Sequence, residues 1–142
     1  MQTRLLRQQH SEIARLLDSI DRVRAIGSEQ ELCVQLVRLA GIVKLHLTLE
    51  DKNLYPTMLR HADPEVRATA QLYKLTMAEL APAYTAFHET WTRPQAISTD
   101  RLRFAREFES ICEKLRKRID LENHDLYDVA DANVELLPEI AS

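Results

Sequence analysis

Apolar side chains recur along most of the chain at steps of three and four residues, the spacing of one face of an α-helix. The pattern predicts four amphipathic helices, over about residues 3–26, 29–56, 64–91 and 100–126. The second of them is expected to add a last turn toward residue 60. Long helices joined by short loops predict an all-α fold, an up-down-up-down four-helix bundle.

Residues between the predicted helices are typical of helix ends. Gly27 is a natural stop for the first helix, and Ser28 opens a capping box for the second. Asp63 is a good N-cap, and Pro64 is a good first residue for the third helix. A side chain within residues 98–100 is expected to cap the fourth helix.

The chain has 142 residues, of which 45% are hydrophobic and 29% are charged, the balance of an ordinary soluble domain. This length predicts a single domain, which the helix pattern places at residues 1–130. The tail that follows, residues 131–142, could pack on the bundle or offer a surface to a protein partner. Its apolar side chains are Val134, Leu136, Leu137 and Ile140.

Charge and hydropathy argue against two classes of partner. A net charge of −3 does not suit a protein that neutralises the phosphates of nucleic acid. No uninterrupted apolar run approaches the roughly 20 residues of a membrane-spanning helix, so no membrane contact is expected. The start of the sequence lacks the apolar segment of a signal peptide, which makes the cytoplasm the expected location. Cys33 and Cys112 show no pairing pattern and are expected near the core.

One phrase of the sequence occurs twice. Residues 49–55 read LEDKNLY, and residues 121–127 read LENHDLY. In each copy the glutamate follows a basic side chain by four residues, a spacing that stacks both groups on one face of a helix. The two copies differ in that basic residue, which is His46 before Glu50 and Arg118 before Glu122.

Antiparallel helices would bring several ionisable side chains of the predicted core stripes to one end of the bundle. These side chains are His10, His46, Glu50, Arg118 and Glu122, with Tyr73 near them. Ionisable groups inside a core are costly unless they pair with one another or hold a metal ion. Imidazoles and carboxylates that converge from separate helices suit iron, zinc or manganese.

Three blocks of the sequence together resemble the hemerythrin-like family, also called the HHE cation-binding domain. They are residues 8–13 around His10, the block from His46 to Pro56, and the block from Leu115 to Tyr127. The resemblance spans most of the chain, from Leu5 to about Ala130. It implies a four-helix bundle with a non-haem di-iron centre, used for oxygen binding, iron handling or redox sensing. Carried over residue by residue, it implies metal ligands at His10, His46, Glu50 and Glu122.

Two departures from the family pattern limit this expectation. The histidine that the family carries on its fourth helix is Arg118 here, and arginine stays protonated and cannot bind a metal. The histidine of the third helix has no match near residues 73–77. We therefore expect one iron ion or none, rather than a full di-iron centre. The expected role is metal, oxygen or redox sensing, or storage, and not enzymatic turnover.

A second hypothesis belongs to a different class of function. Arg118 could replace the metal and bridge Glu50 and Glu122 by forked hydrogen bonds. The protein would then be a metal-free helical regulator that acts by binding another protein. His88 is expected at the opposite end of the bundle, His124 is expected to face solvent, and His61 is expected in a loop, so none of them is assigned to the site.

Overall fold

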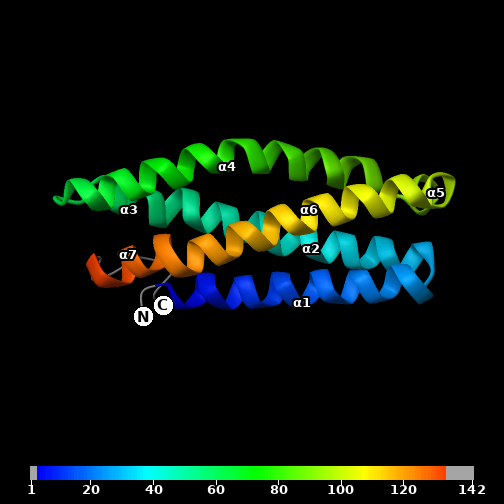
Figure 1. The fold of residues 1–142 in the computed structure, drawn as a ribbon. Helices are drawn as coiled ribbons and strands as arrows, with labels where there is room; N and C mark the ends of the chain where they lie inside the picture. The colour runs from blue at the N-terminus through cyan, green and yellow to red at the C-terminus, as the bar shows by residue number, and fades with distance from the viewer. Residues whose placement is uncertain (1–2, 134–142) are drawn as a thin grey trace.

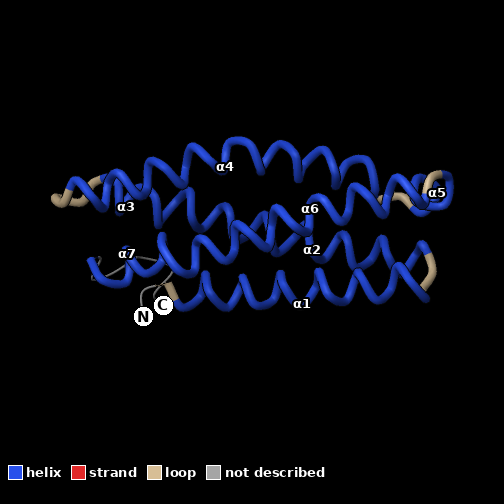
Figure 2. Tube along the Cα trace, viewed as in Figure 1, coloured by secondary structure: helices blue, strands red, loops and turns tan. Residues whose placement is uncertain are grey.

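The computed structural model describes residues 3–133, and every regular element in that range is helical (Figures 1 and 2). The elements are α1 (Arg4–Ile26), α2 (Glu29–Leu49), the π-helical turn η1 (Glu50–Leu54), α3 (Tyr55–Leu59), α4 (Pro64–Trp91), α5 (Pro94–Thr99), α6 (Arg101–Leu121), the π-helical turn η2 (Glu122–Leu126) and α7 (Tyr127–Asn133). The prediction of an all-α chain is confirmed for the described residues.

The elements form long rods that lie lengthwise beside one another in Figure 1. One rod is α1, the next runs from α2 through η1 into α3, the third is α4, and the last runs from α6 through η2 into α7. The α1–α2 turn and the short helix α5 lie at one end of the molecule, and the α3–α4 turn and α7 lie at the other. Helix α1 packs on α2, and α4 packs on both α2 and α6.

Three of the expected helix caps are present. The Ser28 side chain accepts the N–H of Glu31 at 3.2 Å, and the Asp63 side chain accepts the N–H of Glu65 at 2.9 Å. Asp100 caps α6 by accepting the N–H of Arg103 at 3.1 Å. Each cap satisfies a backbone donor that has no partner within its own helix.

The rod of the second helix continues past Pro56 as far as Leu59, in agreement with the last turn expected toward residue 60. Two features were not predicted from the sequence, and the first is that this rod passes through the π-helical turn η1. The segment before α6 is not a plain loop, because residues 94–99 form the short helix α5. Pro94 begins this helix, where its missing N–H costs nothing, and Ile97 is fully buried beneath it.

The apolar core has two parts, with a polar layer between them. The larger part includes an aromatic group near α5, in which Phe104 lies 5.5 Å from Trp91 and 5.9 Å from Phe108 between ring centroids. The smaller part lies at the opposite end and includes Leu6 and Leu54, both fully buried. Apolar layers on both sides therefore seal the polar layer from water.

The rod from Glu29 to Leu59 is long and apolar enough to cross a membrane by length and composition alone, with a mean hydropathy of 1.6 over its most apolar window. A core helix of a soluble protein has the same character, and this rod carries buried His46 and Glu50 into the polar layer. That the chain makes no membrane contact stays a prediction. The apolar tail residues from Val134 onward lie outside the described residues.

The start of α1 is tied to α7 by hydrogen bonds. The backbone N–H of Thr3 donates to the Asp131 carboxylate at 2.9 Å. Arg7 donates to the same carboxylate at 3.1 Å and to Asp128 at 3.0 Å. The first and last turns of the described chain are thus joined.

We expect Phe108→Ala to lower the free energy of unfolding by about 3–5 kcal/mol, because it empties space in the aromatic group of the larger core. Urea unfolding followed by circular dichroism measures the change. The matched control is Leu102→Ala on the same helix, where the side chain is 70% exposed and the expected change is within about 0.5 kcal/mol. Equal effects of the two substitutions would contradict this account of the core.

Candidate metal centre

The structure brings the five ionisable residues of the predicted core stripes together. His10 comes from α1, His46 from α2, Glu50 from the start of η1, Arg118 from α6 and Glu122 from the start of η2. None of the five is more than 8% exposed, and Glu50 is fully buried. The polar layer is therefore a compact buried cluster rather than a set of surface charges.

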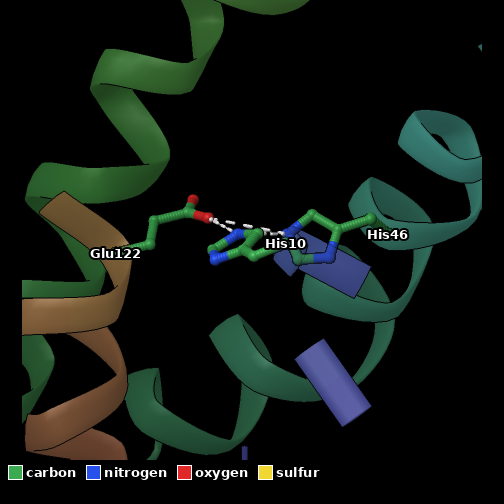
Figure 3. Close-up of side chains that lie close together, drawn as sticks. All are labelled: His10, His46 and Glu122. Atoms are coloured by element: carbon green, nitrogen blue, oxygen red, sulfur yellow. Dashed lines mark hydrogen bonds and ion pairs between the residues drawn. The ribbon is translucent and has the colours of Figure 1, made fainter. Parts of the chain in front are cut away.

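The side chains of His10, His46 and Glu122 point toward one another with the atoms that could bind a metal ion (Figure 3). The Nε2 atoms of His10 and His46 lie 3.0 Å apart. Glu122 Oε1 lies 2.8 Å from His10 Nε2 and 3.5 Å from His46 Nε2. A cation placed among these three atoms would be in reach of all of them, since they lie within 4.8 Å of one another.

Amide oxygens hold both imidazoles in one orientation. Nδ1 of His46 lies 2.8 Å from Oε1 of Gln9, and Nδ1 of His10 lies 2.8 Å from Oδ1 of Asn123. An amide oxygen can only accept a hydrogen bond, so each Nδ1 carries its hydrogen. The Nε2 atoms of both rings are thus left to face the centre, as in histidines that bind a metal through Nε2.

Both glutamates begin a π-helical turn, and a tyrosine follows each turn. The N–H of Tyr55 donates to the carbonyl of Glu50, and the N–H of Tyr127 donates to the carbonyl of Glu122. In an ordinary α-helix, residues five apart would point about 140° away from each other. The wider turn instead places Tyr127 on the face of Glu122, and such turns are frequent at functional sites.

Tyr127, like Gln9 and Asn123, belongs to the centre but was not assigned to it from the sequence. Its hydroxyl donates to Oε2 of Glu50 at 2.6 Å and lies 3.2 Å from Oε1 of Glu122. It also lies 3.2 Å from Nε2 of His10 and 3.1 Å from Nε2 of His46. The sequence did contain a signal for this residue. Each copy of the repeated phrase ends in a leucine followed by a tyrosine, and all four of these side chains are buried in the structure.

Glu50 adjoins the three converging side chains from one side. Its Oε2 atom accepts from Tyr127 and lies 3.5 Å from Nε2 of His46. Its Oε1 atom is buried and has no hydrogen-bond partner among the described residues. A buried carboxylate oxygen without a partner is costly, and a bound cation is one way to satisfy it.

Arg118 fills the other side of the cluster. Its Nε donates to Oε2 of Glu122 at 2.8 Å, and one Nη donates to the carbonyl of Tyr73 at 2.8 Å and to the hydroxyl of Tyr55 at 3.1 Å. The guanidinium also donates to Thr76 and lies 4.9 Å from the ring centroid of Tyr73. It is therefore fixed from three elements of the fold.

Arg118 was expected to bridge both glutamates, and this expectation is correct for Glu122 but wrong for Glu50. Within residues 3–133, the guanidinium donates to Glu122 but makes no hydrogen bond to Glu50. Tyr127 takes that place by donating to Glu50. Tyr73 lies near the site, as expected, because it contacts Arg118, and its hydroxyl donates to Asp125 at 2.8 Å.

The two buried glutamates have pKa values shifted in opposite directions. Burial raises the pKa of Glu50, and the negative charge of Glu122 raises it further. Burial opposes ionisation of Glu122 too, but hydrogen bonds from His10 and His46 and the charge of Arg118 hold its pKa well below the usual range. Burial would lower the pKa of His46, yet the charges of Glu50 and Glu122 raise it to about 9.

These donors fit a single metal ion. Two imidazole nitrogens and a carboxylate oxygen are the ligand set of many iron, zinc and manganese sites. Their separations of 2.8, 3.0 and 3.5 Å are close to the roughly 3.0–3.4 Å between neighbouring ligands around such an ion. The position matched to His46 in the repeat is Arg118, whose positive charge opposes a second ion there.

The other histidines lie away from this centre, as expected. His61 is half-buried at the α3–α4 turn and hydrogen bonds the carbonyl of Asn133 at 3.0 Å. His124 is exposed and pairs with Asp120 of the preceding turn at 3.3 Å. His88 lies in the last turn of α4, far along the chain from the residues of α4 that contact Arg118.

Comparison with known proteins agrees with this arrangement. The family model described as the hemerythrin HHE cation binding domain matches residues 1–130. No curated protein and no solved structure matches the chain. The match covers most of the chain and includes the histidines and glutamates of the centre as well as both π-helical turns. The chain belongs to the hemerythrin HHE cation-binding domain family.

Proposed function

We propose that this protein is a hemerythrin-like up-down-up-down bundle that binds one metal ion, most naturally iron, at a degenerate site. His10, His46 and Glu122 would hold the ion, with Glu50 as a further carboxylate beside them. The observation that carries the proposal is the 3.0 Å approach of two imidazole Nε2 atoms next to a buried carboxylate, in rings whose Nδ1 atoms are each held by an amide oxygen. Two such Nε2 atoms repel unless a proton or a metal ion lies between them.

We expect a single ion because the two copies of the repeat contribute different basic residues to the centre. His46 and Glu50 belong to the first copy of the repeat, and Arg118 and Glu122 belong to the second. The guanidinium of Arg118 supplies a fixed positive charge where a second histidine would be needed. One metal ion and one arginine would then balance the two buried glutamates.

The chain's own residues would orient the ion and restrict access to it. Gln9 and Asn123 fix the tilt and the hydrogen placement of the two imidazoles. In the absence of metal, the raised pKa of His46 keeps a proton at the same nitrogens, and this proton must leave when a metal ion binds. When bound, iron would supply a redox-active Lewis acid.

The space beside the three donors supports sensing or storage over turnover. An apolar cavity of about 30 Å³ adjoins His10 and His46 and is lined by aliphatic side chains such as Val43 and Leu80. This volume is enough for a molecule of about the size of water. We therefore propose a role in metal, oxygen or redox sensing, or in iron storage, for a non-enzymatic cytoplasmic protein.

The alternative remains a metal-free helical regulator that acts through a protein partner. It draws support from Arg118, whose guanidinium already donates to Glu122, Thr76, Tyr55 and the carbonyl of Tyr73. Such a network could stabilise the core without any metal. Protein purified from iron-supplemented cells distinguishes the two functions, because a stable but metal-free bundle would favour the alternative.

We expect His46→Ala to weaken metal binding strongly, because it removes one of the two converging imidazole nitrogens. Affinity for ferrous iron, measured anaerobically by calorimetry, should fall by more than the roughly 100-fold that changes to the partners of metal ligands can cost. His124→Ala is the matched control, since His124 is exposed and should not alter affinity. Retention of full iron affinity in His46→Ala would refute the proposed site.

We expect Arg118→His to raise the iron content above one ion per chain. The substitution removes a positive charge from the cluster and completes the histidine–glutamate pair of the second copy of the repeat. Elemental analysis of both proteins, purified side by side from the same iron-supplemented medium, measures the change. An unchanged iron content in a folded Arg118→His protein would count against the view that Arg118 stands in place of a second ion.

A further inference from the structure

The hydroxyl of Tyr127 completes a tetrahedron with the three converging donors. Its Oη lies 3.2 Å from Nε2 of His10, 3.1 Å from Nε2 of His46 and 3.2 Å from Oε1 of Glu122. The other three edges join the donors themselves and measure 3.0, 2.8 and 3.5 Å. All six edges are therefore similar in length, although the four atoms come from three different rods.

The size of this tetrahedron matches that of a metal site. A point equidistant from four atoms with these separations lies about 1.9 Å from each of them, close to the roughly 2.0–2.2 Å of metal bonds to histidine and oxygen ligands. Tyrosine oxygen is also an established ligand of iron in proteins. The four atoms need to move only by a few tenths of an ångström to surround an ion.

We propose that Tyr127 is a fourth ligand of the metal ion, bound through its phenolate oxygen. This inference rests on the proposed metal-binding function. On binding, the O–H bond of Tyr127 breaks, the oxygen bonds to the metal ion, and the proton passes to Oε2 of Glu50, which already accepts that hydrogen at 2.6 Å. Glu50 would thereby act as the partner of a ligand rather than as a ligand itself.

The surroundings of Tyr127 fit this role. The side chain is fully buried, and the π-helical turn η2 holds it over Glu122. Its ring stacks on the imidazole of His10 with centroids 5.0 Å apart, so each ring restricts the orientation of the other. The Arg7 guanidinium lies over the ring, 5.5 Å from its centroid, and adds a cation–π contact that holds the ring in place.

Tyr55 provides an internal comparison, because it occupies the matching position in the first copy of the repeat. Its hydroxyl accepts a hydrogen bond from Arg118 at 3.1 Å. The two tyrosines therefore serve opposite halves of the cluster, Tyr55 the arginine half and Tyr127 the half of the two histidines. Only Tyr127 is expected to bind the metal ion.

The test is the visible and resonance Raman spectrum of protein loaded with ferrous iron and oxidised in air. Wild-type protein should show phenolate-to-iron(III) charge-transfer absorption and the enhanced tyrosine ring vibrations that accompany it. Tyr127→Phe should lose both signals and bind iron about 10-fold more weakly or worse. Tyr55→Phe, the matched control, should keep both signals.

Outcomes for this inference and for the proposed function are distinguishable. Iron bound by wild-type protein without phenolate signals, or phenolate signals that persist in Tyr127→Phe, would overturn the inference and leave the metal site standing. A wild-type protein that binds no iron would overturn both. If Tyr127→Phe fails to fold, as judged by circular dichroism, Tyr55→Phe decides the matter, because phenolate signals that persist without Tyr55 support the inference and signals lost with Tyr55 would overturn it.

Discussion

Two carboxylates buried side by side impose the main constraint on this fold. Glu50 and Glu122 are removed from water, and two like charges this close inside a protein cannot both ionise without positive partners. Arg118 supplies one permanent positive charge, and the raised pKa of His46 favours a second positive charge on its imidazole. Tyr127 donates to the glutamate that Arg118 does not reach. The contacts of Arg118, His46 and Tyr127 with the two glutamates follow from this balance.

The repeated phrase explains how one chain builds two related halves. Each copy ends in a π-helical turn that swings its tyrosine toward a side chain of the other copy, Tyr127 toward His46 and Tyr55 toward Arg118. The halves share their glutamates, turns and tyrosines and differ in the basic residue. The second copy therefore contributes a guanidinium to the cluster where the first copy contributes an imidazole.

Much of the helical plan could be predicted, because apolar spacing and capping residues act locally. The meeting of His10, His46 and Glu122 could also be predicted, since residues at the same level of neighbouring rods must face one another. Tyr127 could not be placed with the α-helical period alone, because the π-helical turn shifts the phase of every residue after Glu122. The hydrogen-bond partners of Arg118 could not be predicted either, because oxygen acceptors from several rods compete for its guanidinium. The spacing of residues along one helix does not show which of these acceptors lies closest.

The hydrogen bonds of Thr3 and Arg7 to Asp131 have a topological consequence. They bring sequence-distant ends of the described bundle into contact, on the side where Arg7 also donates to the carbonyl of Asn123 at 2.9 Å. A circular permutant that links these ends covalently and opens the chain in the distant segment between α4 and α5 would leave every side chain of the polar layer on an uninterrupted helix. The contacts within the polar layer therefore depend on how the helices pack and not on the order in which the chain connects them.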